Sequence, residues 1–553
     1  MHPALPVGFA QSLDLSPFQA HLLYNRGIRE REEVEPYLAD HSIHLHDPLM
    51  LPDMAKAVDR IERAVAAGET IGVFGDFDVD GLTGTALLVL ALGELGAKVV
   101  SYLPDRVDEG HGLNTDAVRS LRAQGVSLLV TVDCGSSSTE EVEVASSLGV
   151  DVIVTDHHTL SDNPPTTIAL VNPSRGDSNY PYGGLTGAGL SFKLVEALWS
   201  ALGRPRPDHF LELAAMGTVA DLGPLTGENR YLVKKGLERL NETRHPGLKV
   251  LIARSRQKYG LLDTDSLAFG LIPRLNAAGR LGNAYLSLKL LTATSLDAAE
   301  PIAEHLERQN DERRRLSEEA VAQAYKKLDR EFGTVPPIII LEHEEWLPGI
   351  LGLVAANLTE SFYRPAVAVL VEGETCRASA RSIPEFDIIS ALHQSRDLFH
   401  RYGGHPRAAG FAMSASDLPR LKMELTKVAD EELGASELVP SIDVDCEITP
   451  ALLDAPNVNF IQSLSPFGEQ NPAPVFLTRN VRVSEVRQVG QQKQHLKMRV
   501  SHSGRIWEAI AFRQGARGVT MGDTLDLVYT AAMNHWRDQP RLELNVLDFR
   551  PGR

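Results

Sequence analysis

The stretch TIGVFGDFDVDG, residues 70–81, places an apolar run directly before three aspartates and a glycine. The run is short and continuously apolar, which is typical of a strand that is buried on both faces of a parallel sheet. Asp76, Asp78 and Asp80 follow it at every second position. In an extended strand end these three side chains point to one side, with a helix expected to begin near Leu82. The pattern therefore raises the question of what neutralises three neighbouring negative charges.

Similar apolar runs recur between about residues 50 and 225, and helical stretches separate them. The runs are TIGVFG, AKVVSYL, VSLLVTVD, VDVIVTD and TIALVNP, and two of the helical stretches are GTALLVLALGELG and SSTEEVEVASSLG. Short apolar strands that alternate with helices predict an α/β domain with a doubly wound parallel sheet. In such sheets the functional site lies at the carboxyl ends of the strands.

Acidic clusters stand at the ends of several of these runs. Asp133 ends one strand-like run, Asp156 ends the next and is followed by His157 and His158, and Asp221 follows an apolar helix. Because strand ends meet at one edge of the sheet, we expect these side chains to converge. Packed carboxylates raise each other's pKa unless a cation neutralises them, and oxygen ligands with an imidazole suit Mg²⁺ or Mn²⁺. About four to six such ligands can hold the two ions of a phosphoester hydrolase.

Simpler explanations exist for each residue taken alone. An aspartate at a strand end often caps the following helix, and a single histidine is more often structural than a metal ligand. The DxDxD spacing also occurs in calcium loops, but the preceding strand and Gly81 do not match an EF-hand. The sequence contains neither CxxC nor HExxH, which disfavours a zinc site. Four acidic clusters in one sheet domain together favour a metal centre.

Three further parts follow the first sheet. Residues 295–332 form a charged helical run, which predicts one long helix that joins two lobes. PPIIILEHE then begins a second, smaller α/β unit that extends to about residue 435. From about residue 477, alternating strand patterns predict five or so short strands in an OB-like β-barrel.

The charge distribution is uneven along the chain. The 553 residues carry a net charge of −18, yet residues 477–553 hold thirteen Lys and Arg against seven Asp and Glu. A basic module on an acidic body indicates a domain that contacts a polyanion, although chance clustering would give the same numbers. The sequence shows no bilayer-length apolar run and no signal-peptide pattern. Three widely spaced cysteines, Cys134, Cys376 and Cys446, fit a reducing cytosol, so we expect a cytoplasmic protein without a membrane partner.

The ordered motifs resemble those of a known superfamily. FGDFDVDG, TVDCG, VTDHH and TVADLGPLTGENR resemble the four motifs of the DHH phosphoesterase superfamily. RLNAAGRLGNA, SARSI, RYGGHPRAAGF and SPFGEQNPAPVF are similar to segments of the RecJ family, bacterial single-strand-specific 5′→3′ DNA exonucleases. The resemblance covers nearly the whole chain. It implies an N-terminal extension packing on the core at 1–49, a DHH catalytic domain at 50–290, a connecting helix at 291–333, a DHH-associated substrate-binding domain at 334–440, and an OB-fold-like single-stranded-DNA-binding domain with its preceding linker at 441–553.

The resemblance also implies roles for individual residues. It makes His158 a group that supports a ligand or contacts the phosphate, and it leaves Asp76 as either a third ligand or an orienting neighbour. The implied metal ligands are Asp76, Asp78, Asp80, Asp133, His157 and Asp221, and the catalytic set is Asp78, Asp80, Asp133, His157, His158 and Asp221. The implied substrate-binding residues are Arg106, Arg280, Ser379, Arg381, Gly404 and His405. Basic and aromatic residues expected to bind a single strand are Lys493, Lys497, Arg499, Trp507, Arg513 and Trp536, with Phe512 and Tyr529 as further aromatics, of which about half should be core.

The function implied by the resemblance is a nuclease with two Mn²⁺ or Mg²⁺ ions per active site. It would degrade single-stranded DNA 5′→3′ to mononucleotides in DNA repair and recombination, as a monomer, with a single-strand-binding protein and a helicase as partners. One departure from the family pattern is WLPGILG, where Leu347 replaces a histidine, so a DNA contact made by that histidine would be missing. Two alternatives remain. A phosphodiesterase for short oligonucleotides or cyclic dinucleotides is disfavoured by the basic barrel, and a non-catalytic replication scaffold is disfavoured by the intact motif acids.

Overall fold

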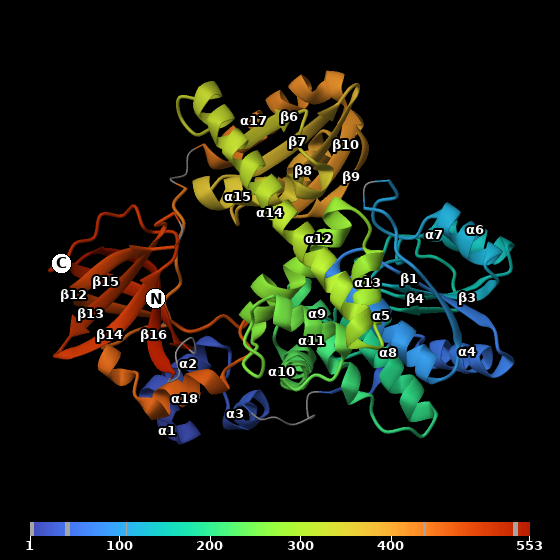
Figure 1. The fold of residues 1–553 in the computed structure, drawn as a ribbon, viewed down its shortest axis with the longest axis horizontal. Coiled ribbons are helices and arrows are strands. Elements are labelled where there is room, and N and C mark those ends of the chain that lie inside the picture. Colours follow the sequence, from blue (N-terminus) through green and yellow to red (C-terminus); the bar gives the residue numbers. More distant parts are fainter. Residues whose placement is uncertain are drawn as a thin grey trace. The chain divides into compact units, whose positions relative to one another are not determined.

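The computed structural model describes residues 5–38, 45–106, 108–434, 438–490, 492–534 and 540–552. The chain divides into two compact units (Figure 1). The larger unit comprises Asp47–Gly223 and Lys235–Pro440, and the smaller unit comprises Met1–His46, Pro224–Lys234 and Ser441–Arg553. Across the described ranges, we find no helix with the length and apolarity needed to cross a bilayer.

A five-stranded parallel sheet organises the first lobe of the larger unit. Its strand order is β2-β1-β3-β4-β5, and every neighbouring pair is parallel. Gly75 lies opposite Val132, and Val132 lies opposite Thr155, so the carboxyl ends of three strands are level. The predicted doubly wound parallel sheet is therefore confirmed. The strands are β1 (Thr70–Gly75), β2 (Lys98–Tyr102), β3 (Val126–Val132), β4 (Asp151–Thr155) and β5 (Ala169–Val171).

Helices cover both faces of this sheet, which explains why its strands are apolar throughout (Figure 1). α6 and α7 pack on one face over a cluster that includes Phe74, Leu129 and Val152. α5 has no polar face and packs between the sheet, α8 and α9. The helices of this lobe are α4 (Met54–Ala67), α5 (Val79–Glu94), α6 (Thr115–Ala123), α7 (Thr139–Ser147), α8 (Gly187–Ala201), α9 (Leu211–Ala220), α11 (Pro246–Arg254), α12 (Ile272–Leu281) and α13 (Tyr285–Leu291), while α10 (Gly227–Asn241) belongs in part to each unit.

One long helix, α14 (Leu296–Glu331), joins the two lobes of the larger unit. Its N-cap is Ser295, whose side chain accepts a hydrogen bond from the Ala298 N–H. α14 packs against α11, α12 and α13 of the first lobe, and its later residues Ala320, Ala324 and Leu328 lie in the core of the second. The helix predicted over residues 295–332 is thus observed with nearly the same bounds.

The second lobe is a mixed five-stranded sheet of order β6-β7-β8-β10-β9. β6 and β7 are parallel, and the remaining neighbours are antiparallel. Its elements are β6 (Ile339–His343), α15 (Leu351–Phe362), β7 (Ala366–Glu372), β8 (Thr375–Arg381), α16 (Ile388–Gln394), β9 (Phe399–His405), β10 (Ala408–Ser414) and α17 (Leu418–Leu433).

The smaller unit contains the C-terminal barrel. Its sheet order is β11-β12-β13-β14-β16-β15, and an additional pairing of β12 with β15 closes the barrel. The predicted OB-like barrel is therefore confirmed. Leu13, Phe18, Leu22 and Leu23 of the N-terminal helices lie in the same apolar core as the barrel strands. The elements are α1 (Phe9–Leu13), α2 (Pro17–Asn25), α3 (Arg31–Leu38), β11 (Cys446–Glu447), α18 (Ala455–Ser463), β12 (Val475–Val489), β13 (His495–His502), β14 (Arg505–Ala511), β15 (Thr524–Asn534) and β16 (Arg541–Pro551).

Candidate active site

The candidate site begins where β1 passes into α5. Asp78 is the N-cap of α5, because its Oδ1 accepts hydrogen bonds from the N–H groups of Asp80 (3.0 Å) and Gly81 (3.2 Å). The expected extended alternation is therefore wrong: the helix begins at Val79, and Asp80 lies in its first turn. Gly81 permits this early start, since a Cβ there would lie only 2.7 Å from the backbone N and O of Asp76.

Asp80 is held at the N-terminus of α8. Its Oδ1 accepts hydrogen bonds from the Thr186 hydroxyl (3.0 Å) and the Ala188 N–H (2.9 Å). Its Oδ2 accepts one from the Gly187 N–H (2.6 Å). The positive end of a helix dipole stabilises a carboxylate, so this buried side chain has a fixed orientation. Gly217 makes room for it, because a Cβ at that position would lie 2.5 Å from Asp80 Oδ1.

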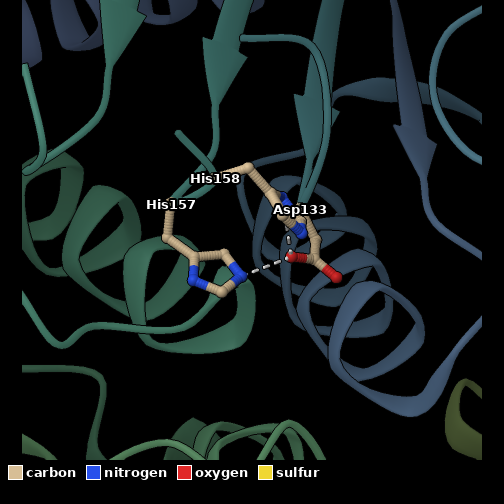
Figure 2. A group of neighbouring side chains, drawn as sticks. All are labelled: Asp133, His157 and His158. Carbon is tan, nitrogen blue, oxygen red and sulfur yellow. Dashed lines mark ion pairs between the residues drawn. The ribbon is translucent and has the colours of Figure 1, made fainter. Parts of the chain in front are cut away.

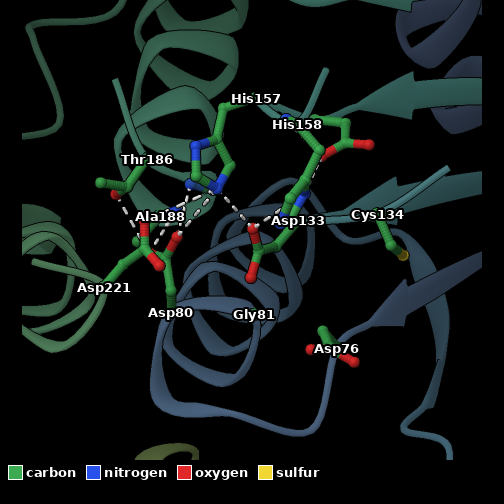
Figure 3. A network of polar contacts seen from close by, with 12 residues as sticks. Asp76, Asp80, Gly81, Asp133, Cys134, His157, His158, Thr186, Ala188 and Asp221 are labelled. Atoms are coloured by element: carbon green, nitrogen blue, oxygen red, sulfur yellow. Dashed lines mark hydrogen bonds and ion pairs between the residues drawn. The ribbon is translucent and has the colours of Figure 1, made fainter. Parts of the chain in front are cut away.

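Asp133, His157 and Asp221 converge on this carboxylate (Figure 3), and Figure 2 shows His157 against Asp133. His157 Nε2 lies 3.0 Å from Asp133 Oδ1, 3.6 Å from Asp221 Oδ2 and 4.0 Å from Asp80 Oδ2. Among the described residues, neither Asp133 Oδ1 nor His157 Nε2 has a hydrogen-bond partner, although both atoms are buried. Buried polar atoms are nearly always satisfied, so two ligand atoms this close without a hydrogen bond fit a shared cation.

The possible ligand atoms form three overlapping groups, each within 4.8 Å. One group contains Asp80, His157 and Asp221, and a second contains Asp76, Asp78 and Asp133. A third, formed by Asp133, His157 and His158, links the first two. Acids that are distant in the sequence are thus brought together, and Asp133 belongs to two of the three groups.

Burial and like charges raise the pKa of several of these acids. Burial first, and then Asp76 and Asp80, raises the pKa of Asp78 to about 6. Burial followed by Asp80 and Asp78 raises the pKa of Asp221 to about 8, and the pKa of buried Asp133 is raised well above its ordinary value. Each shift disfavours the charged form, so a divalent cation would relieve the repulsion. The donor set of carboxylates and imidazole therefore fits Mn²⁺ or Mg²⁺.

His158 is oriented by Asp156, which does not join the converging ligand atoms. Asp156 Oδ1 lies 2.7 Å from His158 Nδ1, and Asp156 Oδ2 accepts a hydrogen bond from the Ser136 N–H at 2.9 Å. This hydrogen bond with Asp156 raises the pKa of His158 to about 9. Figure 2 shows the rings of His157 and His158 beside Asp133. His158 is thus fixed at one nitrogen, beside a candidate ligand.

Asp76 has a partner that the sequence pattern did not reveal. His111 Nδ1 lies 2.9 Å from Asp76 Oδ2, and the His111 ring lies 4.3 Å from the ring of Phe77. His111 stands between Gly110 (φ 77°) and Gly112 (φ 89°) on the loop that follows β2. The GHG triplet marks a sharp turn, but nothing in the sequence places that turn beside Asp76.

Two of the predicted arginines, Arg106 and Arg280, lie next to the segment that carries Asp78. Arg106 stacks over the ring of Phe77 at 4.1 Å, and Arg280 Nη1 donates to the Gly349 carbonyl at 2.9 Å. Arg381 donates only to its own strand, and in the described parts of the chain none of the three arginines forms an ion pair with a carboxylate. Three half-buried guanidinium groups without carboxylate partners are suited to binding an anion.

The second lobe presents the predicted Ser379, Arg381 and His405 on one face of β8, β10 and β9. Ala408 of β10 is paired with Arg381 on one side and with His405 on the other, so these residues form one row across the sheet. Ser379 is uncharged, and its hydroxyl oxygen accepts a hydrogen bond from Arg381 Nη1 at 3.2 Å. Gly404 has a φ of 146° and leaves no room for a Cβ, which would lie 2.3 Å from the Ala408 carbonyl.

Leu347, the residue predicted to replace a family histidine, is 39% exposed. It precedes the turn Pro348–Ile350. Gly349 of this turn accepts the hydrogen bond from Arg280, and a Cβ at Gly349 would lie 2.0 Å from the Arg280 carbonyl. The turn therefore contacts the backbone of α12 through Gly349, and this contact does not involve the side chain at position 347.

In the barrel, the predicted basic and aromatic residues do not share one face. Arg499 pairs with Glu485 at 2.8 Å, and Lys497 is engaged by Glu543 and Glu508. Trp507 lies opposite the buried Val500 and packs against the barrel core.

Other aromatic and basic positions in the barrel differ in exposure. Tyr529 is fully buried, whereas Phe512 is 55% exposed and lies 5.3 Å from the ring of His495. Lys493 and Arg513 are exposed turn residues with positive φ. Trp536 lies outside the described residues.

Family models match three parts of the chain. The DHH family N-terminal domain matches residues 70–218, the DHHA1 domain matches residues 335–433, and the RecJ OB domain matches residues 444–548. The single-stranded-DNA-specific exonuclease RecJ of Bacillus subtilis is 35% identical over 542 residues, which cover 97% of this chain and 68% of that protein. The chain belongs to the RecJ family. The RecJ exonuclease of Escherichia coli is 33% identical over 93% of each chain.

Solved RecJ structures have the same fold. RecJ from Thermus thermophilus in complex with Mn²⁺ has a TM-score of 0.83 and 32% identity, covering 100% of this chain and 79% of that chain. Its complex with Mg²⁺ has a TM-score of 0.77 and 31% identity, covering 100% of this chain and 78% of that chain. The predicted RecJ resemblance is confirmed, and the expected Mn²⁺ or Mg²⁺ cofactor agrees with both complexes.

Proposed function

We propose that this protein is a metal-dependent exonuclease that degrades single-stranded DNA from its 5′ end. The observation that carries the proposal is the position of the unpaired arginines directly beside the converging acids. Arg106 stacks over Phe77, which directly precedes Asp78, and a Cβ at Gly279, the neighbour of Arg280, would lie 3.2 Å from the Phe77 carbonyl. The acids fit the cleavage of a phosphodiester, and the arginines fit the binding of another phosphate on the same strand. The RecJ relatives are named single-stranded-DNA-specific exonucleases, in agreement with this arrangement.

Two cation positions are proposed within the acidic group. Asp80, His157 and Asp221 would hold one ion, and Asp76 and Asp78 would hold the second, with Asp133 reaching both. Ions bound there would lower the pKa of a water molecule and stabilise negative charge on the leaving oxygen. Asp80 is fixed by the N-terminus of α8, and Asp78 by its role as N-cap, so both carboxylates are oriented before substrate binds.

His158 and His111 are proposed to support these ligands. His158, held at Nδ1 by Asp156, offers its other nitrogen to an oxygen of the scissile phosphate. His111 would fix the orientation of Asp76 as a ligand, because its Nδ1 lies 2.9 Å from Asp76 Oδ2.

The strand polarity follows from the proposed anion pocket. Arg106, Arg280, Ser379 and Arg381 would bind the terminal 5′-phosphate, and Gly404 and His405 would contact the backbone from the adjacent strand. When the terminal phosphate is seated there, the acids reach the next phosphodiester bond, so each cut releases one mononucleotide. Arg is suited to this role because its planar donors bind phosphate in a bidentate manner.

The domain bounds are proposed as 50–290 for catalysis, 291–333 for the connecting helix, 334–440 for substrate binding and 441–553 for single-strand binding with its linker. The extension at 1–49 contributes apolar side chains to the barrel core. Lys493, Lys497, Arg499, Arg513 and Trp536 are proposed to contact the strand, with exposed Phe512 as a stacking position, whereas the predicted Trp507 packs against the barrel core.

The cellular setting is proposed from the family resemblance. The protein would act as a cytoplasmic monomer in DNA repair and recombination, with a single-strand-binding protein and a helicase as partners. Sedimentation of the purified protein, alone and with each partner, would test the oligomeric state and both associations.

The direct test uses one single-stranded oligonucleotide labelled at either end, with Mn²⁺ or Mg²⁺ and with EDTA as control. We expect 5′ label to appear first as a mononucleotide, no cleavage in EDTA, and no degradation of a blunt duplex. Asp78→Asn should abolish cleavage while keeping the helix cap, because asparagine is also a good N-cap. Release of the 3′ label first, or unchanged turnover by Asp78→Asn, would refute the proposal. Faster hydrolysis of a dinucleotide than of a long strand would favour the phosphodiesterase alternative.

A further inference from the structure

The loop after β2 carries His111 between two glycines. Glu109 fixes the base of this loop, because its carboxylate accepts hydrogen bonds from the Tyr102 hydroxyl (2.9 Å) and the Asp105 N–H (2.8 Å). The His111 side chain lies beyond this anchor and is 65% exposed, and both neighbouring glycines have positive φ. Glycine stiffens a backbone least of all residues, so the imidazole needs a further contact to hold its place.

Asp76 depends on His111 for the orientation of its side chain. The sheet fixes only its backbone, whose N–H donates to the Val132 carbonyl at 3.3 Å. One carboxylate oxygen, Oδ2, lies 2.9 Å from His111 Nδ1. The other, Oδ1, is buried and has no hydrogen-bond partner among the residues that the structure describes. The imidazole thus holds one oxygen and leaves the second available to a cation.

Arg401 of β9 reaches this loop from the second lobe. Its Nη2 donates to the His111 carbonyl at 3.3 Å. A Cβ at Gly110 would lie only 2.7 Å from Arg401 Nη1, so the guanidinium packs directly on the turn. Across the described ranges it forms no ion pair with a carboxylate, whereas Arg420 of the same lobe pairs with Asp397 at 3.1 Å. The contact of Arg401 with the loop therefore has no competing acid.

β9 connects this loop contact with the proposed substrate-binding face. Arg401 is paired with Ala412 of β10, and His405 is paired with Ala408. Side chains four residues apart on a strand lie on the same face of the sheet. His405 is proposed to contact the backbone of the substrate. One short strand thus carries both a group for the substrate and the group that holds the loop of a metal ligand.

We propose that Arg401 is a positioning residue for the metal centre: by holding the His111 carbonyl it keeps the imidazole on Asp76, so that one Mn²⁺ site depends on a contact between the two lobes. The proposal rests on the proposed metal-dependent exonuclease function. Its effect has the opposite sign to simple electrostatics. A cation repels a nearby guanidinium, so loss of the charge alone would strengthen Mn²⁺ binding, whereas loss of a positioning contact weakens it.

Isothermal titration of the DNA-free protein with Mn²⁺ separates these two effects. Arg401→Gln should weaken one of the two Mn²⁺ sites by about 10-fold, as when a group that supports a ligand is removed. Arg401→Lys should lose less, because lysine keeps a donor for the carbonyl. Arg396→Gln is the matched control, since Arg396 Nη1 lies 3.2 Å from His393 Nε2 of its own lobe. Unchanged or tighter Mn²⁺ binding by Arg401→Gln, or equal weakening by the control, would overturn the proposal.

Binding of a single strand in EDTA distinguishes positioning from a direct DNA contact. Arg401→Gln should bind the strand with wild-type affinity when no metal is present. Weaker binding of the strand, with unchanged Mn²⁺ affinity, would make Arg401 a DNA contact and overturn the positioning role. In the presence of Mn²⁺, the same variant should recover wild-type kcat once the metal is saturating, and a kcat that stays low would also contradict the proposal.

A double variant tests whether Arg401 acts through His111. His111→Phe keeps a ring beside Phe77 but lacks the nitrogen that contacts Asp76, so it should weaken the same Mn²⁺ site. Adding Arg401→Gln should cause no further loss, because both changes act on one carboxylate, and additive losses would overturn the assignment. Wild-type protein that binds two Mn²⁺ ions but degrades no single strand would refute the exonuclease function and leave the positioning role intact.

Discussion

Gly217→Ala should weaken metal binding although Gly217 is not a candidate ligand. A Cβ at this position of α9 would lie 2.4 Å from Ala188 Cβ, 2.5 Å from Asp80 Oδ1 and 2.6 Å from Thr83 Oγ1. Unstrained contacts between such atoms need roughly 3.5–4.0 Å, so these groups must separate by about 1 Å. Asp80 is one of the groups that must yield, and its three hydrogen bonds to the start of α8 resist this movement.

The size of the effect follows from two opposing contributions. Overpacking in a close-packed interior typically costs about 1–3 kcal/mol. The gain in helix propensity from glycine to alanine offsets about 1 kcal/mol of this. We therefore expect a net loss of stability of about 1 kcal/mol, together with a 10- to 100-fold loss of Mn²⁺ affinity of the kind seen when groups supporting a ligand are disturbed.

Isothermal titration with Mn²⁺, and nuclease activity as a function of Mn²⁺ concentration, measure this effect. The variant should recover activity at high Mn²⁺, which a merely unfolded protein would not do. Gly93→Ala is the control, because a Cβ at Gly93 of α5 meets no atom within 4 Å. Wild-type Mn²⁺ affinity in folded Gly217→Ala protein would refute the reasoning.

Three other predictions follow from the buried acids and the barrel. Burial raises the pKa of Glu212 from 4.5 to about 7, so the folded protein retains a proton that the unfolded chain releases in this window. The free energy of unfolding should therefore fall by about 3 kcal/mol as the pH rises from 4.5 to about 7. Denaturant titrations at pH 5 and 8 measure this difference, and Glu212→Gln should remove it. Asp78→Ala should be about 1 kcal/mol less stable than Asp78→Asn by thermal denaturation, and equal stabilities would contradict the capping role. Phe512→Ala should weaken single-strand binding by about 1–3 kcal/mol without lowering Tm, whereas Trp507→Ala should lower Tm. Weaker binding by Trp507→Ala at an unchanged Tm would show instead that Trp507 is the stacking residue.

Much of the fold could be predicted because its signals are local and periodic. The continuous apolar runs predicted a sheet covered on both faces, and α5 and α7 supply part of that cover. The uninterrupted run at residues 295–332 predicted α14. The contact of Phe18 and Leu22 with the barrel core could not be predicted, because their partners lie more than 400 residues away and any apolar face would satisfy the same pattern.

The candidate site was predicted less completely, because its details depend on close approach. The convergence of the strand-end acids follows from sheet topology alone. The early start of α5 depends on the close contact between Gly81 and the backbone of Asp76, and hydrophobic periodicity in the sequence does not reveal such a contact. His111 reaches Asp76 from the loop after β2, far from it in the sequence. Such residues become visible only when burial and missing partners are known.

The composition of the smaller unit has a consequence for synthesis on the ribosome. Leu13, Phe18, Leu22 and Leu23 pack with strands that begin near residue 446. At about 5–20 residues per second, the N-terminal helices must wait roughly 20–90 s for these partners to be translated. During that time the larger unit can complete its own sheets, while four apolar side chains at the start of the chain remain uncovered. The nascent protein should therefore be a client of ribosome-associated chaperones, and a message truncated before the barrel would leave the N-terminal helices prone to aggregation.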